Sequence, residues 1–392
     1  MKKIAFIEEG FLGSTLPLAR EFCRRGYAVD LYFIRNEIHE PEGCECDYCS
    51  PHYGICKIPS KEIKQIKEYV SPSLFQMYTI CLTMPYHSIP VVRNIADLAI
   101  AIQLKHVARK INSMGYEMVN IVANYNFDRY RHFFDYLADN VALSLHEVAD
   151  HFCFSNKPYP LLKKAIKKGI PLVVFSRNTM QSAQKIQGIC PNNIFYIPFG
   201  LFDSFKNIPA AELPESIPEK FILFYGYILP YKGLSVLYEA VRVLGEELGD
   251  YRVVVAGKGY DPIIDEIKED SRFCLIQRFL FNREIVFLLQ KAYAVVCPYL
   301  TMSQSGIPQT SFVFSTPVIA SDLDGFKEVL NPDNSILFRS NDAQSLAQAI
   351  RKLIKDKGKR DIMSNNIKNY YRLNPQYAWD KICDKYIQNF HL

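Results

Sequence analysis

The sequence predicts an α/β protein with two doubly wound parallel sheets. Three observations indicate this fold class. The chain has 392 residues, which is too long for one ordinary hydrophobic core. Short apolar segments alternate with helical patterns along most of its length, as in parallel sheets covered by helices. A stretch rich in Pro, Glu and Ala at residues 205–218 interrupts this alternation and divides it into two series.

The first series opens with a β-loop-α-β unit. Its strand, loop, helix and second strand are expected at residues 4–7, 8–14, about 15–25 and 27–34. Further apolar strands are expected at residues 118–123, 141–145, 171–175 and 194–198. Residues 36–60 break the alternation with Pro, Gly, Cys and His, and we interpret them as an insertion or a long loop. Residues 61–112 have a mainly helical pattern.

The second series is more regular. Its strands are expected at residues 221–225, 251–256, 273–276, 293–297, 317–320 and 335–338. Helices are expected between them at residues 233–247, about 261–268, 282–292, 308–315 and, after the last strand, 342–354. The tail at 376–390 is predicted to be helical because Tyr377, Trp379, Ile382 and Tyr386 recur at helical spacing.

These patterns predict three parts of the chain. We expect an N-terminal domain at 1–205 with a Cys-rich insertion at about 36–60, a C-terminal domain at 206–375 and a C-terminal helix at 376–392. Ligands of doubly wound sheets bind beyond the carboxyl ends of the strands. The functional site is therefore expected in the cleft between the two domains.

Composition favours a cytoplasmic protein. Hydrophobic residues make up 49% of the chain and charged residues 22%, which is typical of a globular protein in water. The apolar start stops at Glu8, too early for a signal peptide, and no apolar run reaches the length of a membrane span. The net charge of +5 is modest and no nucleic-acid motif is present, so we expect no nucleic-acid partner.

Lysine and arginine gather in three groups in the N-terminal half. The groups are Lys57, Lys61, Lys64 and Lys67; Lys105, Arg109 and Lys110; and Lys163, Lys164, Lys167 and Lys168. They are either solvated helix faces or a surface for anionic lipid headgroups or a diphosphate-linked acceptor. Residues 69–92 are rich in aromatic and aliphatic side chains, which either pack in a core or form a patch in contact with the cytoplasmic face of a membrane.

The stretch from 221 to 328 has the features of a phosphate site. Its strands end in glycine or a small residue before a loop or helix, as at Gly226 and Gly257. Lys232 follows the first strand in a Pro-Tyr-Lys-Gly turn, and Gly233 begins the next helix. A lysine at this place can reach a diphosphate as a point charge. The alternative is an exposed turn lysine.

A second phosphate-binding element is expected at 305–308. Here the sequence Ser305-Gly306-Ile307-Pro308 lies where a strand passes into a helix. Pro308 suits the first helical position because it has no N–H to leave unsatisfied. The free N–H groups of the first turn can then hold a phosphate.

In order and spacing these blocks resemble the nucleotide-sugar-binding domain of the retaining glycosyltransferases of family 4, the group 1 glycosyl transferases. The resemblance covers residues 190–390 well and 1–190 loosely. It implies the GT-B fold, with two Rossmann-like domains facing a cleft and a C-terminal helix that packs back toward the N-terminal domain. It also implies a hexosyltransferase that moves a sugar from a nucleotide-diphosphate sugar to a glycan or lipid-linked acceptor in surface polysaccharide biosynthesis, without a catalytic cofactor. The alternatives are a sugar-nucleotide epimerase-like enzyme and a catalytically weak homologue that serves as a binding or scaffold subunit.

The resemblance also assigns roles to residues. Catalytic roles fall on His146, Lys232 and Glu328. Donor binding falls on Gly226, Tyr227, Gly233, Gly257, Thr301, Ser303, Ser305, Gly306, Ile307 and Thr310. The first-turn loop with Gly10, Gly13 and Ser14 is expected to face the donor diphosphate and the acceptor. The alternatives are purely structural roles. His146 would then be a structural histidine at a strand end, and Glu328 a glutamate favoured at a helix N-terminus.

Three departures from the family pattern affect the donor site. Tyr227 stands where the family usually has an arginine. Either another cation substitutes for it, with Arg278 and Lys258 as candidates, or diphosphate binding is weaker. Two family glutamates have no evident counterpart, and their places fall near Thr301 or Ser303 and near Thr310 or Ser311. A hydroxyl is shorter than a carboxylate and neutral, so these departures affect recognition of the sugar and the ribose.

Four cysteines are concentrated in one short segment. Cys44, Cys46, Cys49 and Cys56 lie within 13 residues, and His52 stands among them. Such thiolates can bind a structural zinc ion in tetrahedral geometry, but the paired Cys-x2-Cys spacing of a strong zinc motif is missing. A structural zinc site, local disulfides and unliganded thiols all remain open.

Overall fold

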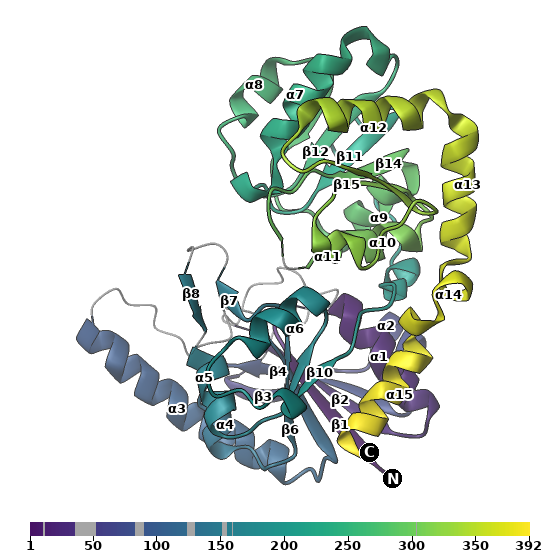
Figure 1. The fold of residues 1–392 in the computed structure, drawn as a ribbon. Coiled ribbons are helices and arrows are strands. Elements are labelled where there is room, and N and C mark those ends of the chain that lie inside the picture. The colour runs from purple at the N-terminus through teal and green to yellow at the C-terminus, as the bar shows by residue number, and fades with distance from the viewer. Residues whose placement is uncertain are drawn as a thin grey trace. The chain divides into compact units, whose positions relative to one another are not determined.

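The computed structural model describes residues 1–10, 12–35, 52–82, 90–123, 130–150, 155–158, 160–302 and 304–392. The chain forms two compact units (Figure 1). Unit 1 consists of Met1–Gly200 together with Tyr377–Leu392, and unit 2 of Leu201–Gln376. Each unit contains one large sheet, and the predicted pair of doubly wound α/β sheets is confirmed.

The sheet of unit 1 has eight strands in the order β10-β9-β6-β5-β1-β2-β4-β3. The strands are β1 (Lys3–Glu8), β2 (Ala28–Arg35), β3 (Gly54–Lys57), β4 (Phe75–Cys81), β5 (Met118–Ala123), β6 (Val141–Leu145), β9 (Leu172–Val174) and β10 (Ile194–Tyr196). All pairings are parallel except that of the edge strand β3 with β4. A separate antiparallel pair is formed by β7 (Ala149–Asp150) and β8 (Ser155–Pro158).

Helices connect these strands and cover the sheet. They are α1 (Leu12–Arg24), α2 (Lys64–Val70), α3 (Pro90–Asn112), α4 (Phe133–Tyr136), α5 (Pro160–Lys167), α6 (Arg177–Gln184) and α15 (Trp379–Phe390), with a 3-10 turn at Pro191–Asn193. Helices on both faces explain why the central strands are apolar throughout. In β1, for example, Ile4, Phe6 and Ile7 are fully buried.

Two strands of the N-terminal half were not predicted. Residues 61–112 are mainly helical through α2 and α3, as expected, but β4 lies between these helices and pairs with β2 along its whole length. Its residues follow the alternation of a strand, with Phe75 and Met77 fully buried, so this part of the apolar 69–92 stretch packs in the core. The presumed insertion at 36–60 contributes β3, whose four residues extend the sheet at its edge.

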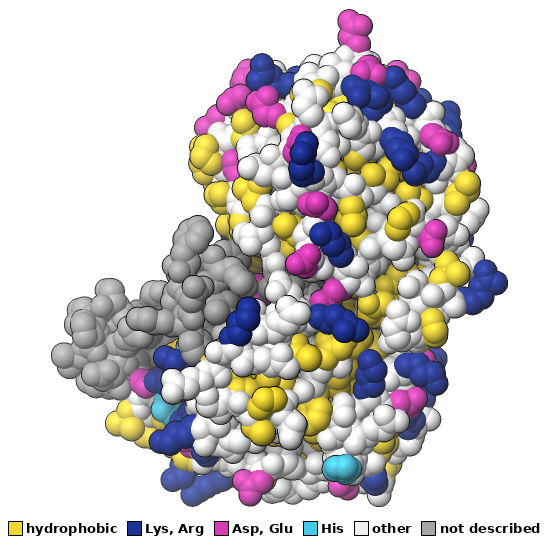
Figure 2. All heavy atoms as spheres, in the orientation of Figure 1, with side chains coloured by type: hydrophobic (Ala, Val, Ile, Leu, Met, Phe, Trp, Pro, Cys, Tyr) yellow, Lys and Arg dark blue, Asp and Glu magenta, His cyan; other side chains and the backbone are white. Residues whose placement is uncertain are grey.

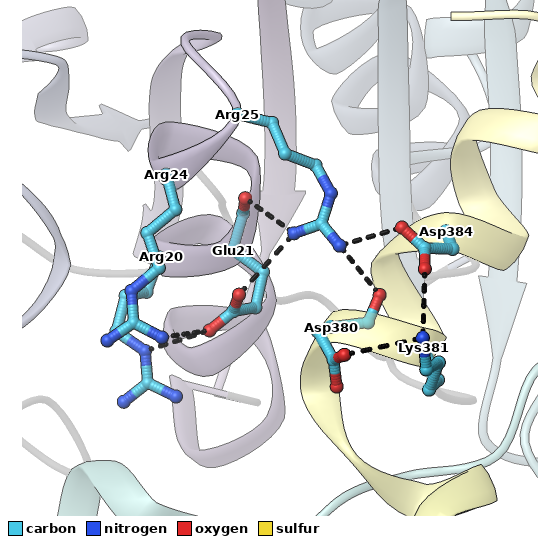
Figure 3. Close-up of polar contacts among 7 residues, drawn as sticks. All are labelled: Arg20, Glu21, Arg24, Arg25, Asp380, Lys381 and Asp384. Atoms are coloured by element: carbon cyan, nitrogen blue, oxygen red, sulfur yellow. Dashed lines mark hydrogen bonds and ion pairs between the residues drawn. The ribbon is translucent and has the colours of Figure 1, made fainter.

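The C-terminal helix α15 packs on unit 1, as predicted. Trp379, Ile382 and Tyr386 are buried, which confirms the helical spacing. Polar contacts also join α15 to α1 (Figure 3). Arg25 donates to Glu21 of α1 at 3.4 Å and to Asp384 of α15 at 2.7 Å. The same guanidinium donates to the carbonyl of Asp380 at 2.9 Å, so a single side chain connects the two helices.

The sheet of unit 2 has six parallel strands in the order β13-β12-β11-β14-β15-β16. The strands are β11 (Phe221–Tyr225), β12 (Arg252–Ala256), β13 (Phe273–Ile276), β14 (Ala294–Cys297), β15 (Val318–Ser321) and β16 (Ser335–Phe338). The helices are α7 (Leu234–Leu244), α8 (Ile264–Glu269), α9 (Asn282–Lys291), α10 (Ile307–Val313), α11 (Asp324–Lys327), α12 (Ala343–Lys355), α13 (Lys357–Lys368) and α14 (Tyr370–Leu373). Short 3-10 turns lie at Asp203–Asn207, Pro230–Lys232, Gly245–Leu248 and Pro375–Tyr377.

The strand order of unit 2 reverses between β11 and β14. From β11 the chain first adds β12 and β13 on one side and then returns to add β14, β15 and β16 on the other (Figure 1). At such a reversal the loops after the two central strands turn away from each other, which leaves a crevice where ligands of doubly wound sheets bind. The loops after β11 and β14 contain residues 226–233 and 298–306.

Surface charge is mixed over the face of the molecule drawn in Figure 2, where basic and acidic side chains are interspersed. Among the helices that the structure describes, none has both the length and the hydropathy needed to cross a bilayer.

Candidate functional site

Backbone hydrogen bonds tie together the loops that follow β11, β12 and β14. Gly226 N donates to Ala256 O at 3.0 Å, and Ile228 N donates to Lys258 O at 2.8 Å. On the other side, Leu300 N donates to Tyr231 O at 2.8 Å. The carboxyl edge of the sheet is therefore a fixed backbone surface.

Two of the predicted glycines are required by this close approach. Gly233 has a φ of +68° at the start of α7, and a Cβ there would overlap the carbonyl oxygen of Pro298. Gly257 has a φ of +156°, and a Cβ there would overlap the carbonyl oxygen of Gly226. Both positions exclude larger residues for steric reasons as well as for backbone strain.

Lys232 ends the 3-10 turn Pro230–Lys232 and is only 9% exposed. The alternative of an exposed turn lysine is therefore wrong. Its Nζ would lie 3.2 Å from a Cβ placed on Gly226, so the ammonium stands directly above the first residue after β11. Burial lowers the pKa of Lys232 from its ordinary 10.5 to about 8. Among the described residues, no carboxylate forms an ion pair with it.

Buried polar atoms without hydrogen-bond partners line the same end of the sheet. In the part of the chain that the structure describes, they include the hydroxyls of Tyr225 and Tyr299 and the side-chain oxygen of Gln309. Thr310 and Ser311 lie near the Tyr225 hydroxyl, but both donate to carbonyls of their own helix, at 2.9 and 2.7 Å. Burial raises the pKa of both tyrosines, so both hydroxyls keep their protons.

The predicted donor-binding residues after β14 occupy different settings. Ser305 Oγ accepts from Ile307 N at 3.3 Å, and Gly306 precedes α10. Pro308 is the second residue of that helix, not the first as expected. The Thr310 hydroxyl donates its proton to Gly306 O, so this hydrogen bond is made at the start of the helix itself. Thr301 is exposed, and Ser303 lies outside the described residues.

Tyr227 and Arg278 add no unpaired positive charge to the donor site. The Tyr227 side chain is 57% exposed. Arg278 donates to Glu215 at 2.8 and 2.9 Å and to Glu284 at 2.8 and 3.0 Å, so this predicted substitute is neutralised by two carboxylates. Lys258 is exposed in the loop after β12.

Glu328 directly follows α11 and forms its C-terminal cap. The alternative of a glutamate favoured by a helix N-terminus is therefore wrong, because the last turn of a helix carries the negative end of the dipole. The side chain is half-buried.

In unit 1, Gly10 lies in the turn after β1, but Gly13 and Ser14 lie in the first turn of α1. The helix starts at Leu12, three residues earlier than expected, so the loop is shorter than predicted. Glu8, the last residue of β1, is fully buried and accepts from Thr15 Oγ1 at 2.6 Å. This contact joins the end of β1 to α1.

His146 directly follows β6, as predicted. Its ring packs against Phe175 and Phe199, with centroid distances of 4.9 and 5.2 Å. Burial lowers the pKa of His146 from its ordinary 6.5 to about 3. The imidazole is therefore neutral at pH 7, where it can form hydrogen bonds but does not carry a proton as a cation.

Only one member of the cysteine group is described. Cys56 lies in β3 with its Sγ 3.4 Å from Nδ1 of His52, whereas Cys44, Cys46 and Cys49 lie outside the described residues. Within the described ranges no group of three or more potential ligands is placed to hold a metal ion. The structural zinc site therefore stays a prediction.

Comparison with known proteins adds sequence evidence for unit 2. Residues 208–370 match the family described as Glycosyl transferases group 1. Two uncharacterized glycosyltransferases of Methanocaldococcus jannaschii are each 25% identical to the chain, over 41% and 47% of its length. O-antigen chain mannosyltransferase C of Escherichia coli is 24% identical over 58% of it. The matches cover 45%, 50% and 62% of these relatives, so the chain spans about half the length of the curated relatives it matches.

Solved structures agree over the whole chain. Sucrose-phosphate synthase of Thermosynechococcus elongatus has a TM-score of 0.66 at 16% identity and covers 100% of this chain and 98% of its own. Anabaena HepE, in complex with UDP and glucose, has a TM-score of 0.65 at 14% identity with 100% of both chains covered. At these identities the likeness shows the fold. The protein has the GT-B fold, and its residues 208–370 are similar to group 1 glycosyl transferases.

The ring beside Lys232 was not predicted from the sequence. Tyr225 ends β11, which was expected as an apolar strand, and Tyr299 lies just after β14, beyond the strand expected at 293–297. A signal was present, because each tyrosine stands at the carboxyl end of a buried strand. It could be recognised only once the sheet order placed β11 beside β14.

Proposed function

We propose that the chain is a retaining glycosyltransferase of family 4. It transfers a hexosyl group from a nucleotide-diphosphate sugar to a glycan or lipid-linked acceptor in surface polysaccharide biosynthesis. The observation that carries this proposal is Lys232, a buried ammonium at the strand-order reversal of unit 2 that forms no ion pair with any described carboxylate. A buried charge without a counterion is costly unless a ligand supplies one.

The donor diphosphate supplies that counterion. As the bond between sugar and diphosphate breaks, negative charge grows on the leaving phosphate, and a fixed ammonium stabilises it without reorganisation. In a retaining transfer of this type the leaving diphosphate also helps to deprotonate the acceptor on the same face of the sugar. The protein therefore contributes mainly by positioning and by charge, with no protein nucleophile.

In this proposal Lys232 is the single cation that we assign to the donor diphosphate. Tyr227 can donate one hydrogen bond but brings no charge, and Arg278 is already paired with Glu215 and Glu284. The hydroxyl of Tyr225 is a buried donor at the same end of the sheet. Together with the N–H groups at 305–307 it is the neutral partner that we assign to the donor.

His146 acts through hydrogen bonding in this proposal. Its neutral ring, fixed by Phe175 and Phe199, suits a hydrogen bond to a substrate hydroxyl. With a pKa of about 3 it is a poor proton carrier at neutral pH. Glu328 is the remaining carboxylate that we assign to the donor sugar.

The comparisons favour a nucleotide sugar as the donor. Group 1 glycosyl transferases match 208–370, HepE is described in complex with UDP and glucose, and one relative is described as a mannosyltransferase. The GT-B fold is shared with a protein described as a putative UDP-N-acetylglucosamine 2-epimerase of Listeria monocytogenes, so the fold by itself does not select the reaction.

The test begins with a thermal-shift screen of the whole chain against UDP-, GDP- and ADP-sugars. The donor that stabilises the protein is then used in a turnover assay with the Lys232→Ala variant. Lys220→Ala is the matched control, because Lys220 precedes the same strand at its other end and pairs with Asp250. We expect Lys232→Ala to lower turnover by orders of magnitude and the control to remain near wild type.

Three outcomes separate the alternatives. Near-wild-type turnover of Lys232→Ala removes the proposed role of this lysine. Donor binding without hydrolysis or transfer points to a binding or scaffold subunit. NMR analysis of the anomeric configuration of the product decides between retention and inversion.

We also propose that unit 1 contacts the cytoplasmic face of an anionic membrane through α3. Leu98 and Ile102 are one helical turn apart and are 63% and 52% exposed. Lys105, Arg109 and Lys110 follow on the same helix and are exposed. Exposed aliphatic side chains beside cations are typical of a surface that lies on anionic lipids.

Vesicle flotation tests this contact. The wild type is expected to float with anionic vesicles and less with zwitterionic ones, and Leu98→Ser with Ile102→Ser should abolish flotation. Ile362→Ser in unit 2 is a matched control, since Ile362 is also 63% exposed. Equal flotation of the double variant and the wild type would remove the proposal.

A further inference from the structure

The ammonium of Lys232 faces an aromatic ring. Its Nζ lies 5.1 Å from the centroid of the Tyr299 ring, within the range in which a ring face attracts a cation. Lys232 is 9% exposed and Tyr299 is 3% exposed. Water therefore screens this attraction little, and desolvated cation–π contacts are the strong ones.

The other described groups near the ammonium offer no compensating charge. Burial raises the pKa of the Cys297 thiol to about 12, so this group is neutral at physiological pH. Burial also raises the pKa of Tyr225, which keeps its proton. Within the described part of the chain, the face of the Tyr299 ring therefore attracts the ammonium of Lys232 where no carboxylate does.

The ring is fixed relative to the lysine. Tyr231 precedes Lys232 on the same turn and packs edge-on against Tyr299, with centroids 6.1 Å apart. Phe326 contacts the Tyr299 ring with a centroid distance of 5.4 Å. The hydrogen bond from Leu300 N to Tyr231 O joins the backbones of the two segments. The ring and the turn that carries the lysine therefore form one rigid unit.

We propose that Tyr299 is a positioning residue, whose ring face holds the ammonium of Lys232 above Gly226 at the carboxyl edge of β11. The functional consequence rests on the proposed donor site, in which that ammonium meets the diphosphate. Tyr299 itself acts through the lysine. Because the ring favours the charged amine, its removal lets burial lower the pKa of Lys232 further below the present value of about 8.

The test compares two substitutions of Tyr299. Tyr299→Phe keeps the ring face, whereas Tyr299→Met fills similar volume without a ring, and Tyr299→Leu is the replacement if the Met variant does not fold. The pKa of the Lys232 amine is measured by NMR of protein with carbon-13-labelled lysine, and the signal is assigned with Lys232→Arg. Binding of inorganic pyrophosphate is measured for the same proteins at pH 6.5 and pH 8.

We expect Tyr299→Phe to behave as wild type and Tyr299→Met to lower the pKa of Lys232 by about one unit. The Met variant should then bind pyrophosphate roughly fivefold more weakly at pH 8 but less than about twofold more weakly at pH 6.5, where both amines are protonated. An unchanged pKa in the Met variant would overturn the inference. So would an equal loss of affinity at both pH values, which indicates a structural role, or a loss in Tyr299→Phe equal to that in Tyr299→Met.

The inference and the proposed function fail in different ways. If the wild type binds no pyrophosphate at either pH, the donor site is wrong. The pKa comparison between Tyr299→Phe and Tyr299→Met still decides whether the ring holds the ammonium.

Discussion

The two units contain buried polar clusters of opposite character. In unit 1, Tyr116 donates to Asp30 at 2.6 Å and the hydroxyls of Tyr32 and Tyr116 lie 2.6 Å apart, so these three side chains satisfy one another. In unit 2, Lys232 has no described ion pair, and the buried hydroxyl of Tyr225 has no described hydrogen-bond partner. A cluster whose polar groups are paired with one another stabilises the fold. A cluster whose polar groups have no partners, at a strand-order reversal, is available to bind a ligand.

The largest effect is expected from Lys232→Met. Removal of the ammonium should weaken nucleotide-sugar binding by about 100-fold or more, because a buried charge contact is lost. The same variant should be more stable than wild type by on the order of 2–3 kcal/mol at pH 7, because burial costs the charged form of Lys232. Calorimetric titration and thermal unfolding measure the two effects.

The direction of this stability change follows from the lowered pKa of Lys232. The pKa of Lys232 falls from 10.5 in the unfolded chain to about 8 in the fold. The unfolded chain thus holds the proton more tightly, and wild-type stability increases as the pH rises from about 8 to 10.5. The stability difference between Lys232→Met and wild type should shrink over this range. Lys220→Met, at an exposed ion pair, should show neither effect, and a destabilised Lys232→Met would contradict the comparison.

Tyr116→Phe tests the satisfied cluster and should show the reverse pattern. It leaves the buried Asp30 carboxylate without a donor and the Tyr32 hydroxyl without its partner. The expected loss is about 2 kcal/mol of unfolding free energy, with donor affinity unchanged. Chemical denaturation at several pH values measures it.

The loss in Tyr116→Phe should depend on pH. Burial raises the pKa of Asp30 above its ordinary 3.8, and the Tyr116 hydrogen bond limits that rise. Stability from such a group is present at low pH and is lost as the pH rises through the raised pKa. The variant should therefore lose more at pH 7 than at pH 4. An equal loss at both values, or a loss of donor affinity, would count against this role for the cluster.

The pH dependence of donor affinity separates Lys232 from His146. With a pKa of about 8 for Lys232, affinity at pH 9 should be about tenfold lower than at pH 7. Because the pKa of His146 is about 3, no inflection is expected between pH 5 and pH 7. Titrations across this range measure the profile. An inflection near pH 6.5 that disappears in His146→Gln would show that the histidine titrates in the site.

Tyr225→Phe should have the smallest effect on the fold. It removes a buried hydroxyl without a described partner, so stability should stay unchanged or rise by up to about 1 kcal/mol. If the hydroxyl donates to the donor, affinity falls a few-fold. Thermal unfolding and ligand titration of this variant and of Tyr116→Phe compare the two clusters directly. Destabilisation of both variants by the same amount would contradict the proposed difference between the clusters.

Much of the fold could be predicted from sequence, for a clear physical reason. Strands buried on both faces of a parallel sheet are short apolar runs, and β5, β6, β11, β13 and β16 have the predicted bounds. The prediction failed for β4, which was taken as part of a helical region, and for the four-residue edge strand β3. Edge strands are short and only partly apolar, so pairing along the sheet decides them more than local pattern does.

The site residues could be predicted only where they belong to one continuous sequence motif. Lys232 and its glycines follow from one strand-turn-helix segment. The pairing of Arg278 with Glu215 and Glu284 and the ring of Tyr299 beside Lys232 depend on residues that come together only in the folded chain. The ion pairs of Arg278 occupy one of the two candidate substitute cations, and the Tyr299 ring gives Lys232 a partner that the sequence had not indicated.

The most direct test of the central claim is the pKa of the Lys232 amine with and without a nucleoside diphosphate. It is measured by NMR of labelled lysine in the full chain, with UDP, GDP and ADP in turn. If Lys232 holds the donor diphosphate, at least one nucleotide raises its pKa from about 8 to about 10 or above, because the phosphate favours the charged amine. A pKa that stays at the same value while the nucleotide binds would contradict the account.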